Sequence, residues 1–157
     1  MRTLAIIMFL VFNLTVFSQS NKKGELKEMP GFQLEDETGN MFDSKCLEGK
    51  YVLIDFWASW CGPCHKKFPA LQEIYEQFHD SNFEIVGIST DKKKDSWLKA
   101  LEANDLPWIQ LIDSQNDKSI ARDEFGISSL PVLFLFGPDG KLVARDPDLV
   151  EIRDLIK

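Results

Sequence analysis

Cysteine and histidine are scarce in this chain of 157 residues, which has three cysteines and two histidines. A structural zinc site needs four ligands, usually supplied by paired CxxC clusters. The third cysteine, Cys46, is isolated from the other two, and His65 directly follows Cys64, where it is awkwardly placed for the same metal. The scarcity disfavours a metal site, and we expect no metal and no cofactor.

Positive charge is also scarce. Lysine and arginine number 18 against 25 aspartates and glutamates, and the formal net charge is −7. The only basic cluster, residues 92–94, lies between Asp91 and Asp95 and is interpreted as a solvated loop. With no basic patch, nucleic acid is not expected as a partner. The acidic balance also weakly disfavours acidic partners.

No apolar run is long enough for an ordinary membrane span. The apolar stretch 4–17 has 14 residues, including Asn13 and Thr15, whereas a spanning helix needs about 20. It follows Met1-Arg2, and no acidic residue precedes Glu25, which is the layout of a secretory signal. We therefore predict a signal peptide at 1–18, a polar linker at 19–29 and one domain at 30–157. An uncleaved membrane anchor through residues 4–17 stays open.

A pair of cysteines three residues apart is the most informative feature that is present. Trp60-Cys61-Gly62-Pro63-Cys64 follows the apolar run 51–57, at an expected strand-to-helix junction. Residues i and i+3 are neighbours on a helix, so the two sulfurs can bond after a small adjustment. Pro63 is tolerated in a first helical turn, where the helix end also favours a thiolate. Half of a zinc site and a permanent structural disulfide are the alternatives, although so short a loop stabilises little.

Apolar periodicity predicts alternating strands and helices. We expect a hairpin formed by 30–34 and 41–42, and then a central strand at 51–56 that is buried on both faces. Period-3.6 patterns predict a helix at 63–78 with a kink at Pro69, followed by further helices. The remaining elements are strands at 83–89, 108–112, 132–136 and 141–144, and helices at 96–104, 119–125 and 148–156. This order predicts a mixed sheet covered by helices on both faces.

Asp55 is a lone carboxylate in the apolar central strand. Burial disfavours the charged form and is expected to raise its pKa. A buried acid beneath Cys64 could take up the proton of that thiol during disulfide exchange. The alternative is that the side chain escapes to the strand end.

Two motifs together resemble the thioredoxin superfamily, and within it the exported TlpA/ResA-like thiol–disulfide oxidoreductases. The first is the run 56–64, followed by Lys66, Phe68 and Pro69; the second is 127–131, followed by an apolar strand and Pro138-Asp139-Gly140. The resemblance covers about residues 30–157. It implies an α/β thioredoxin fold with a central mixed β-sheet flanked by helices on both faces, an N-terminal β-hairpin and a TlpA-like helical insertion between 83–89 and 108–112.

The resemblance also implies roles for individual residues. Cys61 would be the exposed attacking cysteine, and Cys64 would resolve the mixed disulfide. Pro131 matches the cis-proline of the family, and the backbone of Leu130 would pair with the substrate chain. Trp60, Gly62 and Pro63 would surround the dithiol and contact the substrate.

The acid of the site departs from the TlpA-like pattern. Many of those proteins have Asn at the strand position and Glu three residues after the second cysteine, where this chain has Asp55 and Lys67. Asp55 instead matches the buried aspartate of thioredoxins. The departure speaks against a role specific to cytochrome c maturation.

We therefore expect a thiol–disulfide reductase in the periplasm or another exported compartment, where disulfides persist. The pair Gly62-Pro63 is that of thioredoxin, whose potential is near −270 mV. It would reduce protein disulfides and be recharged by a membrane thiol electron donor. A peroxiredoxin-like thiol peroxidase is disfavoured because no Pro-x-x-x-Thr-x-x-Cys pattern occurs. A redox-linked binding module stays open, and we interpret Cys46 as a semi-buried bystander and His65 as solvated.

Overall fold

The computed structural model describes residues 26–114 and 118–156. The predicted signal peptide, the anchor and most of the linker therefore lie outside the described residues. None of the helices within the described ranges is long and apolar enough to cross a membrane.

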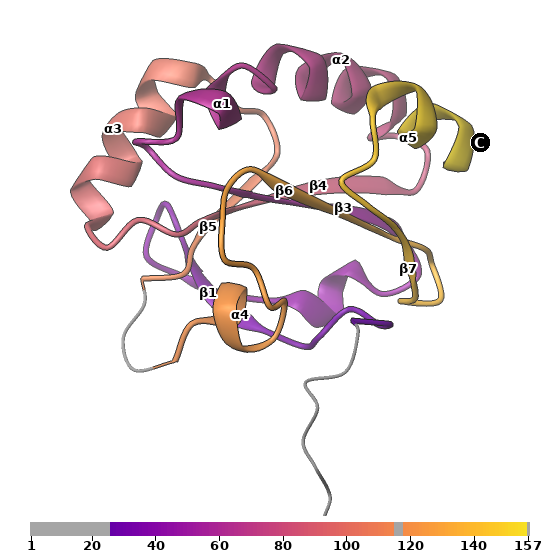
Figure 1. Cartoon of the computed structure of the whole chain (residues 1–157), viewed down its shortest axis with the longest axis horizontal. Helices are drawn as coiled ribbons and strands as arrows, with labels where there is room; N and C mark the ends of the chain where they lie inside the picture. The colour runs from indigo at the N-terminus through magenta and orange to yellow at the C-terminus, as the bar shows by residue number, and fades with distance from the viewer. Residues whose placement is uncertain (1–25, 115–117, 157) are drawn as a thin grey trace, which may run out of the picture.

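A single seven-stranded sheet forms the centre of the fold (Figure 1). Its strands are ordered β2-β1-β5-β4-β3-β6-β7, with β3, β4 and β5 parallel and the other pairs antiparallel. The sheet is therefore mixed, as predicted. The strands are β1 (Gln33–Asp36), β2 (Met41–Asp43), β3 (Tyr51–Trp57), β4 (Phe83–Ser89), β5 (Ile109–Ile112), β6 (Val132–Phe136) and β7 (Leu142–Arg145).

Helices cover both faces of the sheet, which confirms the predicted architecture. The longer helices and the short α1 lie on one face, and two short helices lie on the other (Figure 1). On the first face are α1 (Gly62–His65), α2 (Phe68–Phe78), α3 (Lys94–Asn104) and α5 (Leu149–Leu155); on the second are the 3-10 helix η1 (Ser44–Leu47) and α4 (Ile120–Asp123). The hairpin β1–β2 and the insertion α3–β5 occur where they were expected.

Alternate residues of β3 build two separate apolar layers, because successive side chains of a strand point to opposite faces. We call the layer under α1, α2, α3 and α5 the dithiol layer; it contains Leu53, Trp57, Cys61, Cys64, Phe68, Leu71, Ile85, Trp97, Leu133 and Ile152. We call the other the aromatic layer; it contains Phe32, Ile54, Phe56, Val86, Phe125, Phe134 and Phe136.

The helix predicted at 63–78 is two helices, α1 and α2, and not one kinked helix. Proline has no N–H, so Pro69 cannot bond to the carbonyl four residues earlier. The helix therefore ends before Pro69, which then occupies the first turn of α2, where a missing N–H loses nothing. The helix predicted at 119–125 is only the four residues of α4, and the chain then turns through Gly126 at φ 65°.

Candidate active site

Cys61 and Cys64 are joined by a disulfide at the start of α1, with their Cα atoms 5.3 Å apart. The chain leaves β3 at Trp57 and enters α1 at Gly62, so the pair lies at the predicted strand-to-helix junction. Cys61 is the N-cap residue of α1, and the backbone N–H of Cys64 donates to its Sγ at 3.3 Å. A thiolate on Cys61 would receive the same hydrogen bond.

The disulfide-bonded cysteines are both buried, so the expectation that Cys61 is exposed was wrong for this state. Cys61 keeps 4% of its surface exposed and Cys64 keeps 1%. The residues around them are open, since Gly62 and Pro63 are exposed and Trp60 is 69% exposed. Cys61 therefore retains more contact with solvent than Cys64 does.

Asp55 is buried on β3 and faces the dithiol layer, as Leu53 and Trp57 on either side of it do. The alternative in which its side chain escapes to the strand end is therefore wrong. Burial raises the pKa of Asp55 to about 7, and the charge of Lys67 acts in the opposite direction. Near neutral pH this carboxyl can both accept and release a proton.

The segment before β6 lies beside the start of α1. Leu130 and Pro131 are joined by a cis peptide bond, and the next residue, Val132, pairs with Phe56 of β3. A cavity of about 790 Å³ is lined from one side by Ser59 and Trp60 and from the other by residues 128–130. The structure thus brings the two sequence motifs to one cavity.

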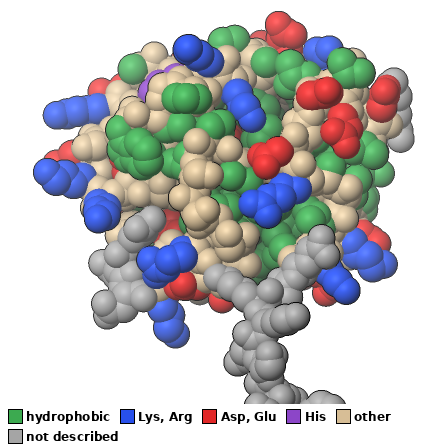
Figure 2. Space-filling view, in the orientation of Figure 1, with side chains coloured by type: hydrophobic (Ala, Val, Ile, Leu, Met, Phe, Trp, Pro, Cys, Tyr) green, Lys and Arg blue, Asp and Glu red, His purple; other side chains and the backbone are tan. Residues whose placement is uncertain are grey.

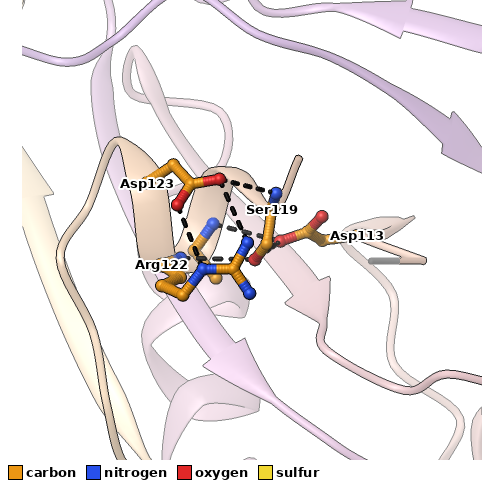
Figure 3. A network of polar contacts seen from close by, with 5 residues as sticks. Asp113, Ser119, Arg122 and Asp123 are labelled. Atoms are coloured by element: carbon orange, nitrogen blue, oxygen red, sulfur yellow. Dashed lines mark hydrogen bonds and ion pairs between the residues drawn. The ribbon is translucent and has the colours of Figure 1, made fainter. Parts of the chain in front are cut away.

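A polar network with two buried members, Asp113 and Ser119, holds the segment that leads to Pro131 (Figure 3). Asp113, at the end of β5, accepts hydrogen bonds from the Ser119 hydroxyl at 2.8 Å and from the Ala121 N–H at 3.0 Å. Asp123 accepts a bond from the Ser119 N–H at 3.0 Å and also pairs with Arg122. These contacts anchor α4 to the sheet, and α4 begins the segment that reaches the cavity.

A second carboxylate anchors the segment before the cysteines, and sequence reasoning missed it. Asp91 is buried and accepts bonds from the Ser59 N–H and hydroxyl, both at 2.7 Å, and from the Ser89 hydroxyl at 2.8 Å. Ser59 and Asp91 are 32 residues apart, and no local pattern links them. The pairing could have been found only from the register of β3 and β4.

The profile of the AhpC/TSA family matches residues 26–145, which include both motifs and the whole sheet. The chain belongs to the AhpC/TSA family. This places it in the thioredoxin superfamily that the sequence motifs indicated.

Several proteins similar to this AhpC/TSA chain are thiol-disulfide oxidoreductases. The thiol-disulfide oxidoreductase ResA of Bacillus subtilis (strain 168) is 30% identical over 135 residues, covering 86% of this chain and 73% of ResA. The thioredoxin domain of a thiol-disulfide oxidoreductase from Bacteroides vulgatus has a TM-score of 0.77 and 30% identity, covering 85% of this chain and 99% of that one.

A thiol-disulfide oxidoreductase from Bacteroides fragilis NCTC 9343 has a TM-score of 0.74 and 29% identity, covering 82% of this chain and 99% of that one. These relatives and the bonded pair Cys61–Cys64 identify the chain as a thiol–disulfide oxidoreductase, an enzyme of the thioredoxin type.

Two other side chains of this family member differ from expectation. His65 is only partly solvated: it is half-buried, its ring packs against Trp57 and Phe68, and its Nε2 lies 3.4 Å from the Ala58 carbonyl oxygen. Cys46 is exposed, and not semi-buried, on η1 at the aromatic-layer side of the sheet. Partial desolvation raises the pKa of its thiol, which reduces its reactivity.

Proposed function

We propose that this enzyme reduces disulfide bonds of other proteins outside the cytoplasm, by dithiol–disulfide exchange through Cys61 and Cys64. The observation that carries the proposal is the bonded pair at the N-terminus of α1, with buried Asp55 on the same side of the sheet.

Cys61 is proposed as the attacking residue. Its sulfur accepts the Cys64 N–H, and it is the more exposed of the two cysteines. The Cys61 thiolate attacks one sulfur of the substrate disulfide, the substrate S–S bond breaks, and one substrate thiolate leaves. The product is a mixed disulfide between enzyme and substrate.

Cys64 is proposed as the resolving residue. Its thiol gives a proton to ionised Asp55, and the resulting thiolate attacks the Cys61 sulfur of the mixed disulfide. The second substrate thiolate leaves, two electrons have passed to the substrate, and the enzyme is left with the Cys61–Cys64 disulfide. A carboxyl with a pKa of about 7 suits this proton transfer because it changes state near neutral pH.

The substrate chain is proposed to lie in the cavity beside the dithiol. The backbone of Leu130, before Pro131, would pair with an extended segment of the substrate, and Trp60, Gly62 and Pro63 would contact it from the other side. Lys92 and Lys93 also line this cavity. The loop that contains them, which the sequence analysis interpreted only as solvated, therefore borders the site. Figure 2 shows Lys and Arg side chains gathered on the side of the molecule where α3 lies.

The sequence supports the proposed direction of electron flow and the proposed compartment. The Gly62-Pro63 pair favours a reducing potential, and the signal-like N-terminus favours export to the periplasm or beyond the membrane. The oxidised enzyme would then need recharging by a thiol donor in the membrane.

The reduction potential of the Cys61–Cys64 pair tests the direction. Equilibration of the purified protein with glutathione or dithiothreitol buffers should give a value near or below about −250 mV, and a value of about −120 to −180 mV would identify an oxidase or isomerase instead. Cys61→Ser should abolish reduction of a disulfide-bonded test protein, while Cys46→Ser should not. If a strain with Cys61→Ser behaves as wild type where a deletion does not, the binding-module alternative is correct.

A further inference from the structure

Asp55, Gly87 and Gln110 lie side by side on three neighbouring strands. Asp55 of β3 is paired with Gly87 of β4, which is paired in turn with Gln110 of β5. Neighbouring strands are about 4.8 Å apart. All three residues have the same strand parity as members of the dithiol layer (Leu53, Ile85 and Ile112), so they face that layer.

The Gln110 carboxamide extends over Gly87 toward Asp55. A Cβ atom placed on Gly87 would lie 2.5 Å from Gln110 Oε1 and 2.9 Å from Nε2. The amide therefore occupies the space that a side chain at position 87 would fill, above the residue that is paired with Asp55. The absence of a side chain on Gly87 is what opens this space.

The same carboxamide is buried without partners. Gln110 is 3% exposed, and neither of its amide atoms has a hydrogen-bond partner among the residues that the structure describes. Buried polar groups in folded proteins are almost always hydrogen-bonded, to protein or to ordered water. An unpaired amide beside a buried carboxyl therefore points to a water that bridges the two.

Gln110, although buried, is also one of the residues that border a second cavity. This cavity, of about 380 Å³, is also lined by Leu98 and Leu101 of α3 and the exposed acidic residues Glu37, Glu102 and Asp105. The row from Asp55 over Gly87 to Gln110 thus connects the interior of the dithiol layer with a cavity bordered by carboxylates.

We infer that Gln110 is a positioning residue for disulfide exchange, whose carboxamide holds a water molecule between itself and the Asp55 carboxyl and so opens a proton path toward the second cavity. The inference rests on the proposed role of Asp55. After Asp55 has taken the Cys64 proton, Asp55 gives this proton to the water, the water passes a proton on to solvent in the second cavity, and Asp55 returns to its ionised form. The carboxamide orients the water and neither gains nor loses a proton.

Few other groups act on Asp55. Among the described residues, the titratable side chains on this layer include the thiols of Cys61 and Cys64, the His65 ring against Trp57 and Phe68, and the partly buried Tyr51 and Tyr75. The charge that acts on the pKa of Asp55 is that of Lys67, between α1 and α2. The other elements packed on this layer present apolar side chains, among them Ile85 of β4, Leu133 of β6, Phe68 and Leu71 of α2, Trp97 of α3 and Ile152 of α5. A change in Asp55 titration after substitution of Gln110 can therefore be assigned to the amide.

Gln110→Met tests the inference, because Met has similar size and lacks the amide. In the full-length enzyme, the carbon NMR signal of the Asp55 carboxyl should titrate about half to one pH unit higher, since the ionised carboxylate loses a hydrogen bond through water. The pH profile of dithiol oxidation should move by the same amount. Gly87→Ala, which displaces the amide, should move both in the same direction. Leu111→Met, on the opposite face, is the matched control and should move neither.

A double-mutant cycle separates positioning from a structural effect. With Asp55→Asn already present, Gln110→Met should change the oxidation rate no further. An unchanged Asp55 titration in Gln110→Met, or an equal rate loss with and without Asp55, would overturn the inference. Either result leaves the proposed function intact, because that function is tested separately by Cys61→Ser.

Discussion

The two layers of this protein share one sheet but differ in what they bury. The aromatic layer contains a cluster of phenylalanines. Phe56 meets Phe125 and Phe134 edge to face, with ring centroids 4.8 Å and 6.0 Å apart. The dithiol layer contains a disulfide, an ionisable carboxyl and a carboxamide without partners in the described structure. Strand β3 contributes to both, with Phe56 on one face and Asp55 on the other.

The aromatic layer therefore serves mainly the stability of the fold, and the dithiol layer serves the chemistry. Aromatic pairs stabilise beyond the area that they bury, and the buried carboxylate on the aromatic-layer side, Asp113, accepts hydrogen bonds from Ser119 and Ala121. The buried carboxyl of Asp55 lowers stability when it ionises, yet that same energetic cost keeps its pKa near neutrality. The dithiol layer can contain a destabilising buried carboxyl because the packing of the aromatic layer stabilises the fold.

The largest expected change in the free energy of unfolding follows a substitution in the aromatic layer. Phe134→Ala removes a fully buried ring and should lower the free energy of unfolding by about 3–5 kcal/mol, as measured by denaturant titration. The reduction potential of Cys61–Cys64 should stay unchanged. Val150→Ala, at a side chain that is 65% exposed, is the control and should cost little. A shifted potential in Phe134→Ala would show that the layers are coupled.

A comparable effect, dependent on pH, is expected for the dithiol layer. Asp55 ionises near pH 4 when unfolded but only near pH 7 when folded, so stability is lost as pH rises through this window. The loss is on the order of 4 kcal/mol. Asp55→Asn should remove this decrease, as seen in unfolding curves from pH 4 to 8. Phe134→Ala should keep the pH dependence of the wild type at a lower stability, and a decrease that persists in Asp55→Asn would assign it to another group.

A smaller effect is expected at the edge of the dithiol layer. Lys92→Glu with Lys93→Glu reverses charge at the active-site cavity and should slow reduction of an acidic disulfide peptide about tenfold relative to a basic one at low salt. The difference should vanish at high salt, because exposed charges are screened. Lys27→Glu with Lys45→Glu makes the same change in net charge away from the cavity and should not discriminate between the peptides.

The smallest effect is expected for the third thiol. Cys46→Ser, on the aromatic-layer side, should change the free energy of unfolding by no more than about 0.5 kcal/mol, because the side chain is exposed. Thiol labelling and potentiometry should give the same Cys61–Cys64 behaviour as in wild type. A changed potential would give Cys46 a redox role.

Much of the fold could be predicted because its signals are local. Continuous apolarity marked β3 and β4 as buried strands, and the Gly137–Gly140 turn marked the last hairpin. Prediction failed at the break between α1 and α2, where a pattern compatible with one helix was interrupted by the backbone chemistry of Pro69. It also failed for the exposure of Cys61 and His65, which depends on the neighbours that folding brings to them.

The sequence by itself determined the reactive pair, its place at a strand-to-helix junction, and the presence of one carboxylate in an apolar strand. These follow from spacing and periodicity, which act over a few residues. Only the tertiary structure decided that Asp91 anchors Ser59 and that Gln110 lies over Gly87 beside Asp55. Those contacts depend on strand order and register, and these are set by the packing of both layers across residues far apart in the chain.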